Sequence, residues 1–264
     1  MSLPEPSSLA QLLALMAKLR DPHGGCPWDR AQTFASLAPY TLEEAYEVVD
    51  AIESGESPAR LCDELGDLLF QVVYHARMAE EAGQFDFADV ARAIADKMIR
   101  RHPHVFGDAA ARDAAEQTAA WETHKSAERA SKAETGTLAG VPAGLPALTR
   151  AAKLTARAAR VGFDWPDAYA VLAKLDEEVA ELRAELPEGR QERLVDEVGD
   201  LLFVLANLAR KLGLDPEGCL RHANHKFMQR FIRMEEAAAI EGKALSEMEL
   251  EEMEAKWQEI KHNQ

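Results

Sequence analysis

One helical segment of this sequence occurs twice, and the duplication constrains the chain to a tandem architecture. The segment 63-DELGDLLFQVVYHARMA-79 returns 133 positions later (196 − 63) as 196-DEVGDLLFVLANLARKL-212. Acidic residues upstream and Lys/Arg pairs downstream recur with it, so the repeat is as long as a domain. We therefore expect two copies of one domain, residues 1–130 and 147–264, joined by a linker at 131–146 that is rich in Ala, Gly and Pro.

The apolar residues of each copy fall on one helical face. Leucines and valines recur at intervals of three and four residues from Leu61 to Val73, and again from Leu194 to Leu205. This period is typical of amphipathic helices, and alternating β-branched runs are few. Clusters of Gly and Pro mark the expected helix ends. The sequence predicts an all-α fold of two tandem bundles, each with about four main helices, and a loop at residues 21–39.

Each copy also carries the acidic pattern E-E-x-x-E followed by D-E-x-x-D. Residues at i, i+3 and i+4 share a helix face, so one helix can present its carboxylates to those of the next. One such pattern alone is usually only a solvated face. Here, however, Glu64 and Glu197 each lie between two leucines of the apolar stripe, where a carboxylate is costly unless it is paired or binds metal. We therefore expect a divalent cation between the two acidic rows.

The types of residue present narrow the choice of cation. Carboxylates without an E-x-x-H pattern favour Mg²⁺, with Mn²⁺ as a substitute, over a di-iron centre. Mg²⁺ often takes phosphate oxygens from a substrate. The pairs Lys97/Arg101 and Lys226/Arg230, each spaced by one helical turn, would supply positive charge for such phosphates, although either pair alone is as readily an ordinary basic face.

Composition excludes several classes of protein. The formal net charge of -16 argues against non-specific nucleic-acid binding. The three cysteines have no C-x-x-C spacing, which favours a reducing compartment. No segment approaches the length of a membrane span, and the N-terminal residues lack the pattern of a signal peptide. We expect a cytoplasmic protein that binds neither membranes nor nucleic acids.

Taken together, these motifs resemble those of the MazG nucleoside triphosphate pyrophosphohydrolases in their two-domain bacterial form. The resemblance covers nearly the whole chain and rests on segments such as 24-GGCPWDRAQTFASLAPYTLEEAYEVVDAI-52, 141-VPAGLPALTRAAKLTARAARVGFDW-165 and 224-NHKFMQRF-231. It implies tandem all-α domains that form homodimers. It also implies Mg²⁺-dependent hydrolysis of nucleoside triphosphates to the monophosphate and pyrophosphate.

The same resemblance implies roles for individual residues. In the second copy it implies four metal ligands, which Glu177 supports. One of Glu178 and Glu181 would be the general base. On the substrate side, Lys226 and Arg230 would act in catalysis. The ligands are Glu178, Glu181, Glu197 and Asp200, and the substrate side is Asn224, Lys226, Arg230, Trp257 and Lys261. The counterparts in the first copy are Glu44, Glu47, Glu64 and Asp67 for metal, and Lys97, Arg101, Trp121 and Lys125 for substrate.

One departure from the repeat favours the second copy as the main catalytic site. Ala95 stands where the second copy has Asn224, so an amide that could contact the nucleotide is missing from the first copy. The alternative functions are a non-catalytic nucleotide- or metal-binding helical module and a metal-storage or oxidase bundle. The sequence alone does not give the preferred base or sugar, or say whether the substrate is a normal or a damaged nucleotide.

Overall fold

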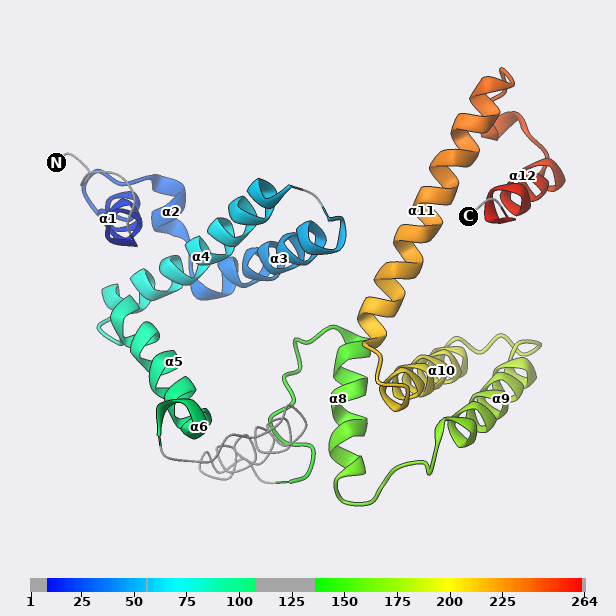
Figure 1. Cartoon of the computed structure of the whole chain (residues 1–264), viewed down its shortest axis with the longest axis horizontal. Helices are drawn as coiled ribbons and strands as arrows, with labels where there is room; N and C mark the ends of the chain where they lie inside the picture. The colour runs from blue at the N-terminus through cyan, green and yellow to red at the C-terminus, as the bar shows by residue number, and fades with distance from the viewer. Residues whose placement is uncertain (1–8, 56, 108–135, 263–264) are drawn as a thin grey trace. The chain divides into compact units, whose positions relative to one another are not determined.

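The structure is a computed structural model that describes residues 9–55, 57–107 and 136–262. The chain divides into two compact units, Met1–His124 and Lys125–Gln264. Every regular element in the described ranges is a helix, so the predicted all-α fold is confirmed (Figure 1). Trp121 and Lys125, two of the predicted substrate-side residues, lie outside the described residues.

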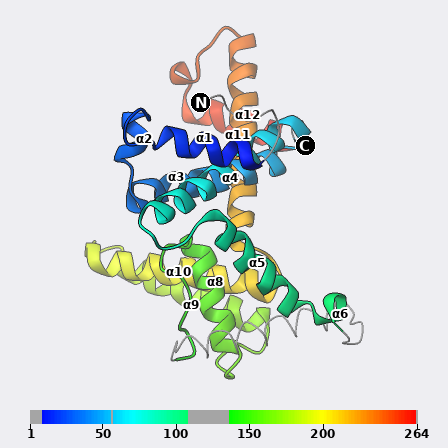
Figure 2. The same ribbon diagram turned by 90° about the vertical axis from the view of Figure 1, so that its left-hand side faces the viewer.

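The N-terminal unit is built around one pair of long helices. The helices α3 and α4 pack along each other, α1 packs on α4, and α5 follows from the end of α4 (Figures 1 and 2). The described helices of this unit are α1 (Leu9–Leu19), α2 (Pro27–Ala31), α3 (Phe34–Glu53), α4 (Pro58–Glu81), α5 (Phe87–Arg101) and α6 (Pro103–Phe106).

The C-terminal unit repeats this pairing with α9 and α10. The helix α8 packs across α10, and the long α11 leaves the α8–α10 layer and carries α12 folded back against it (Figures 1 and 2). The elements are α8 (Ala147–Ala159), α9 (Ala168–Glu185), α10 (Gln191–Lys211), α11 (Pro216–Ile240), the short 3₁₀ helix η1 (Leu245–Glu247) and α12 (Leu250–His262).

Local sequence explains where these helices begin and end. Ser57 caps the N-terminus of α4 through its hydroxyl, and Asp215 caps α11 through its carboxylate, each with proline at the next position. Gly55 follows α3 and Gly213 follows α10. Their φ values are 64° and 72°, a backbone conformation that residues with a Cβ atom disfavour. The predicted breaks at these Gly/Pro clusters are therefore confirmed.

The predicted loop at residues 21–39 is wrong over most of its second half. Residues 27–31 form α2, and α3 already begins at Phe34. Thr33 and Ser36 form a reciprocal capping box that starts α3 at Phe34, six residues before the expected boundary. Pro39 lies inside this helix, where it lacks the N–H that would bond to the carbonyl of Ala35.

The core of the N-terminal unit contains a polar network beneath α2. The hydroxyl of Tyr74 lies 2.7 Å from the backbone oxygen of buried Asp29 and 3.1 Å from its Oδ1, and it donates to this residue. The Arg20 guanidinium also donates to the Asp29 backbone oxygen, lies over the Tyr74 ring and pairs with Glu81 at 2.7 Å. Burial raises the pKa of Tyr74 to about 12, so the phenol remains a donor at neutral pH. The network thus fixes α1, α2 and α4 together.

Tyr74→Phe is expected to lower the free energy of unfolding by about 1–2 kcal/mol, because the buried oxygens of Asp29 lose their phenol donor. Urea unfolding followed by circular dichroism measures this change. Tyr46→Phe, which alters an exposed ring on α3, serves as the control. Equal stabilities of Tyr74→Phe and the wild type would show that the network adds nothing measurable.

Residues 131–146 were predicted to be a linker, and they fall within the second compact unit. Residues 136–146, the part of the predicted linker that the structure describes, contain turns and no helix. None of the helices in the described ranges combines the length and hydropathy of a membrane span.

Candidate metal centres

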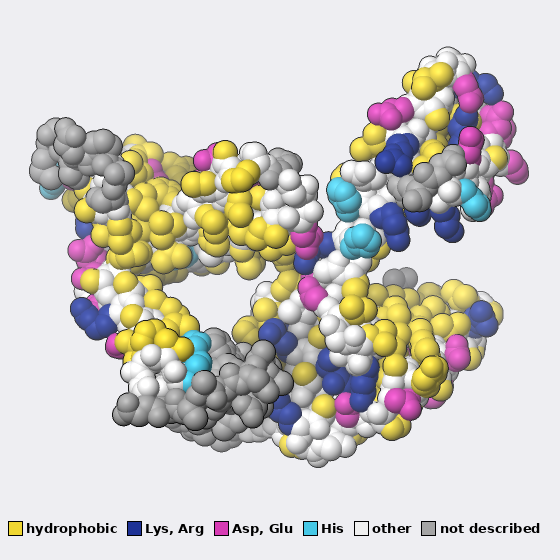
Figure 3. Space-filling view, viewed as in Figure 1, with side chains coloured by type: hydrophobic (Ala, Val, Ile, Leu, Met, Phe, Trp, Pro, Cys, Tyr) yellow, Lys and Arg dark blue, Asp and Glu magenta, His cyan; other side chains and the backbone are white. Residues whose placement is uncertain are grey.

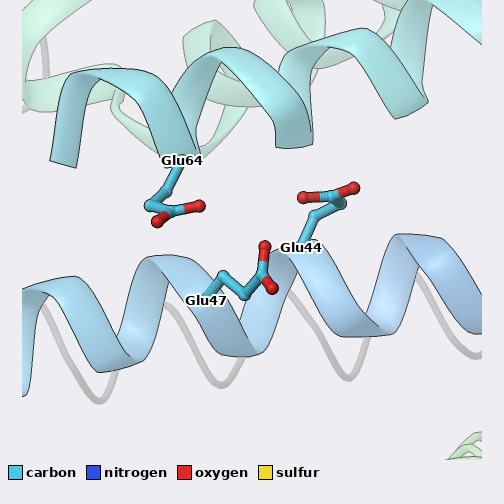
Figure 4. A group of neighbouring side chains, drawn as sticks. All are labelled: Glu44, Glu47 and Glu64. Atoms are coloured by element: carbon cyan, nitrogen blue, oxygen red, sulfur yellow. The ribbon is translucent and has the colours of Figure 1, made fainter. Parts of the chain in front are cut away.

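The N-terminal unit brings three carboxylates together between α3 and α4. Glu44 and Glu47 extend from α3, and Glu64 extends toward them from α4 (Figure 4). One oxygen from each lies within 4.8 Å of the others. Asp67, the fourth predicted ligand, is outside this group but close enough to raise the pKa of Glu44 by repulsion. The N-terminal group therefore contains three of the four predicted ligands.

The C-terminal unit forms the equivalent group between α9 and α10. Glu178, Glu197 and Asp200 each place one carboxylate oxygen within 4.8 Å of the others. Glu178 and Glu197 are buried, each only 4% exposed, and Asp200 lies at the open side. Glu181 is outside the group, although its charge reaches Glu197. The two groups contain different acids of the repeated pattern. The N-terminal group includes Glu47, the last acid of E-E-x-x-E, and the C-terminal group includes Asp200, the last acid of D-E-x-x-D.

The donor set of the C-terminal group fits a hard divalent cation. It consists only of carboxylate oxygens, the ligands that Mg²⁺ prefers. Glu178 Oε2 is buried and has no hydrogen-bond partner among the described residues. Desolvation raises the pKa of Glu197, and repulsion from Glu181, Glu178 and Asp200 adds to the shift although Arg193 opposes it. A bound cation would satisfy the unpartnered oxygen and offset the repulsion.

Each acidic group also contacts side-chain cations that our sequence analysis did not predict. Arg60 lies 3.4 Å from Glu64, and Arg193 lies 3.2 Å from Glu197 at the equivalent position of the repeat. Lys174 pairs with Glu178 at 2.7 Å, and its hydrogen bonds with Glu177 and then Glu178 hold the pKa of the lysine above its usual range. All three pairs have the i, i+4 spacing of helical ion pairs, so that spacing was the signal that could have revealed them.

Gln71 on α4 is a further neighbour of the N-terminal group that the sequence analysis missed. Its Nε2 donates to Glu44 Oε1 at 3.4 Å, while its buried Oε1 has no partner among the described residues. Desolvation raises the pKa of Glu44, and the charges of Asp67 and Glu47 add to this shift although Gln71 opposes it. Sequence spacing could not have indicated this contact, because it crosses from one helix to another.

The predicted substrate side of the C-terminal unit lies on α11 and α12. Asn224, Lys226 and Arg230 are on α11, and Trp257 and Lys261 are on α12. The Trp257 ring packs 5.2 Å from that of Phe227 and lines an apolar groove of about 300 Å³ between the two helices. The main packing partner of α12 is α11. The structure therefore groups the substrate-side residues on an arm distinct from the α9–α10 pair that carries the acids.

In the N-terminal unit the predicted cations Lys97 and Arg101 lie on α5. This helix packs mainly on α4 and α6. Lys97 lines a shallow groove together with Phe85, Val90 and Ile94. The structure thus places the two cations on a different helix from the acids of α3 and the start of α4.

Comparison with known proteins bears directly on the chain's family. A family model for the MazG nucleotide pyrophosphohydrolase domain matches residues 32–106, and a model for phosphoribosyl-ATP pyrophosphohydrolase matches residues 149–227. The chain is 49% identical over 260 residues to the nucleoside triphosphate pyrophosphohydrolase of Escherichia coli strain K12, covering 98% of each protein. The chain belongs to the MazG nucleoside triphosphate pyrophosphohydrolase family.

A second relative of this family is almost as similar. The nucleoside triphosphate pyrophosphohydrolase/pyrophosphatase MazG of Thermotoga maritima is 42% identical over 251 residues, which cover 95% of this chain and 94% of the relative. The MazG match lies over the N-terminal acids and the second match over the C-terminal acids, so the chain has the tandem helical domains expected for the family. The predicted family and the enzyme class, a hydrolase, are confirmed.

Proposed function

We propose that this protein hydrolyses nucleoside triphosphates to the monophosphate and pyrophosphate at the acidic group of its C-terminal unit. The observation that carries the proposal is the buried, partly unpartnered carboxylate pair Glu178 and Glu197 beside Asp200, in a chain of this family. Glu178, Glu181, Glu197 and Asp200 would hold Mg²⁺, which Mn²⁺ could replace. Glu44, Glu47, Glu64 and Asp67 would hold a cation in the N-terminal unit.

The protein's own groups would divide the work of the reaction. Asn224, Lys226 and Arg230 bind and orient the phosphates, and Trp257 with Lys261 positions the nucleoside at the apolar groove. Glu178 or Glu181 accepts the proton of the attacking water. When bound, Mg²⁺ supplies charge neutralisation of the triphosphate and lowers the pKa of water. The N-terminal residues Lys97, Arg101, Trp121 and Lys125 would play the equivalent binding roles, with weaker turnover because of Ala95.

Product analysis tests the proposed reaction. With Mg²⁺ and each of the eight common nucleoside triphosphates, we expect the monophosphate and pyrophosphate in equal amounts by anion-exchange chromatography. Formation of the nucleoside diphosphate and orthophosphate would show that the terminal phosphate is cleaved instead, which would contradict the proposed reaction. Nucleotide binding without any product would favour the non-catalytic module instead. The same assay gives the base and sugar preference.

We further propose that the protein works as a homodimer in which a second copy completes the site. Val198, Leu202 and Leu205 on α10 are 44%, 48% and 45% exposed, and apolar side chains cover the α9–α10 face of the unit (Figure 3). Such a face on a single chain marks an interaction surface. Because α12 packs mainly on its own α11, the arm that carries Lys226 and Lys261 would meet the acidic group between α9 and α10 of another chain.

Leu202→Glu is expected to convert the dimer to a monomer, because it places a charge in the centre of the apolar α10 face. Light scattering should give about twice 29.1 kDa for the wild type and 29.1 kDa for the variant. Turnover should fall by about tenfold or more if the partner contributes to the site. Val161→Glu, at an exposed position after α8, is the matched control. A wild-type mass of 29.1 kDa at assay concentration would refute the dimer.

The remaining proposals concern location and partners. All three cysteines are free of disulfides, which supports a cytoplasmic protein. The net charge of -16 supports the absence of nucleic-acid binding, since phosphate backbones require a basic surface. Its partners are then nucleoside triphosphates and a second copy of the chain.

A further inference from the structure

The apolar groove between α11 and α12 has one acidic residue in its wall. The rings of Phe227 and Trp257 lie 5.2 Å apart there, inclined at 47° to each other, and the Phe227 side chain is 57% exposed. Among the described residues that line the groove, Glu254 alone carries a charge, and the others are apolar. The groove therefore offers aromatic surface and a single carboxylate to whatever fills it.

The Glu254 carboxylate has no protein partner within the described ranges. Two other acids of the arm are paired, Glu252 with Lys243 at 3.1 Å and Glu241 with Lys256 at 2.5 Å. A carboxylate only accepts hydrogen bonds, and a ligand that displaces its water has to donate to it in return. An occupant of the groove is therefore expected to bring N–H or O–H donors to Glu254.

Glu254, Trp257 and Lys261 share one face of α12. Their spacing is i, i+3 and i+7, which spans about 10 Å of helix at 1.5 Å per residue. A hydrogen-bond acceptor, an aromatic ring and a cation thus follow one another along this face. A nucleoside triphosphate presents the same order, with the edge of the base, the ring of the base and then the phosphates. In that orientation Glu254 lies at the end away from the negative phosphates, where repulsion is weakest.

We propose that Glu254 selects guanine among the bases of the substrate by accepting hydrogen bonds from its N1–H and N2–H groups. This inference rests on the proposed function, which places the nucleoside at the groove beside Trp257. Guanine presents two adjacent donors to the two oxygens of one carboxylate. Adenine and cytosine each have a ring acceptor next to the amino group, and this acceptor would face the negative charge. Uracil and thymine have a single N–H between two carbonyl oxygens, so they suit the carboxylate poorly.

The ratio of kcat/KM values among purine nucleotides tests this selection. With Mg²⁺, we expect kcat/KM for GTP to exceed that for ATP about tenfold, as is typical of a bidentate contact to one base. ITP lacks the N2 amino group and should lie between the two. The difference should appear in KM, because a contact to the base is equally strong in the ground state and the transition state. Initial rates of pyrophosphate release over a range of nucleotide concentrations give both constants.

Glu254→Gln distinguishes base selection from a structural role. An amide can accept from N6 of adenine and donate to N1, so the variant should lose the preference for GTP and use ATP at least as well. Glu259→Gln changes an exposed acid of α12 that does not line the groove, and it should keep the wild-type ratio. Equal kcat/KM values for GTP and ATP in the wild type would overturn the proposal. An unchanged ratio in Glu254→Gln with wild-type circular dichroism would also overturn it, and would leave the groove to another occupant such as a second copy of the chain.

Equilibrium binding of the α,β-methylene analogues of GTP and ATP, which cannot be cleaved between these phosphates, separates this inference from the proposed function. If the wild type binds the guanine analogue more tightly but releases no pyrophosphate from any nucleoside triphosphate, the proposed reaction is wrong and the role of Glu254 stands. If it releases pyrophosphate from GTP, ITP and ATP with equal kcat/KM, the inference is wrong and the reaction stands.

Discussion

Removal of divalent cations is expected to reduce pyrophosphate release on the order of 10³-fold or more, and addition of Mg²⁺ or Mn²⁺ should restore it. The reason lies in the C-terminal group, where three carboxylates converge and Glu178 Oε2 has no hydrogen-bond partner among the residues that the structure describes. Without a cation these acids repel the triphosphate instead of holding it. A metal's stabilisation of transition-state charge amounts to several kcal/mol, and each 1.4 kcal/mol changes the rate about tenfold.

The measurement uses protein treated with excess chelator and then dialysed into metal-free buffer. Addition of Ca²⁺, which takes a larger coordination shell, provides a matched control, since it should bind but support turnover poorly. Circular dichroism before and after chelation shows whether the helices persist. Turnover that continues undiminished in excess chelator would exclude the metal-dependent reaction.

Much of this site could be predicted from the sequence, because helical periodicity carries most of the geometry. Carboxylates at i, i+3 and i+4 share a face wherever a helix forms, and the repeat indicated that each acidic row faces a second one. The structure brings such rows together in both units. The helix ends at the Gly/Pro clusters could also be predicted, because the backbone conformation at a helix end depends on only one or two residues.

What the sequence could not supply is contact between helices. Asp67 and Glu181 match the motif but lie outside the tight groups, because the rotation of one helix against its neighbour decides which carboxylates converge. The contact of Gln71 with Glu44 depends on the same rotation. The loop prediction at residues 21–39 was wrong where the Thr33–Ser36 cap starts α3 ahead of Pro39. The exposed apolar face of α10 likewise appears only when the packing of a single chain is known.

The difference between the two acidic groups predicts that substitutions in the two units affect turnover unequally. Asp200 belongs to the C-terminal group, whereas Asp67, its counterpart, lies outside the N-terminal one. The N-terminal unit also has Ala95 where the other has Asn224. A less negative site, such as one that contains Lys174, is better suited to accept a polyphosphate. All three differences favour catalysis in the C-terminal unit.

Asp200→Ala is therefore expected to lower turnover on the order of 10²-fold or more, because loss of a ligand weakens metal binding and misplaces the phosphate. Asp67→Ala should cost much less, since its unit is not the main catalytic one. Initial rates of pyrophosphate release at saturating Mg²⁺ measure both. Asp196→Ala is the matched control, because Asp196 lies one turn earlier on α10 and its side chain is 64% exposed.

Stability must be measured alongside, since each substitution removes a charge that repels its neighbours. Glu197 has its pKa raised by desolvation first and by the neighbouring acids, Asp200 among them, so Asp200→Ala should relieve repulsion and leave the fold at least as stable. A loss of activity with unchanged circular dichroism and oligomeric mass then reports on the site itself. If Asp67→Ala abolishes turnover while Asp200→Ala leaves it near the wild-type value, the N-terminal unit is the catalytic one. If each substitution halves the rate, the two units turn over independently, and neither the missing amide at position 95 nor the charge of Lys174 affects catalysis.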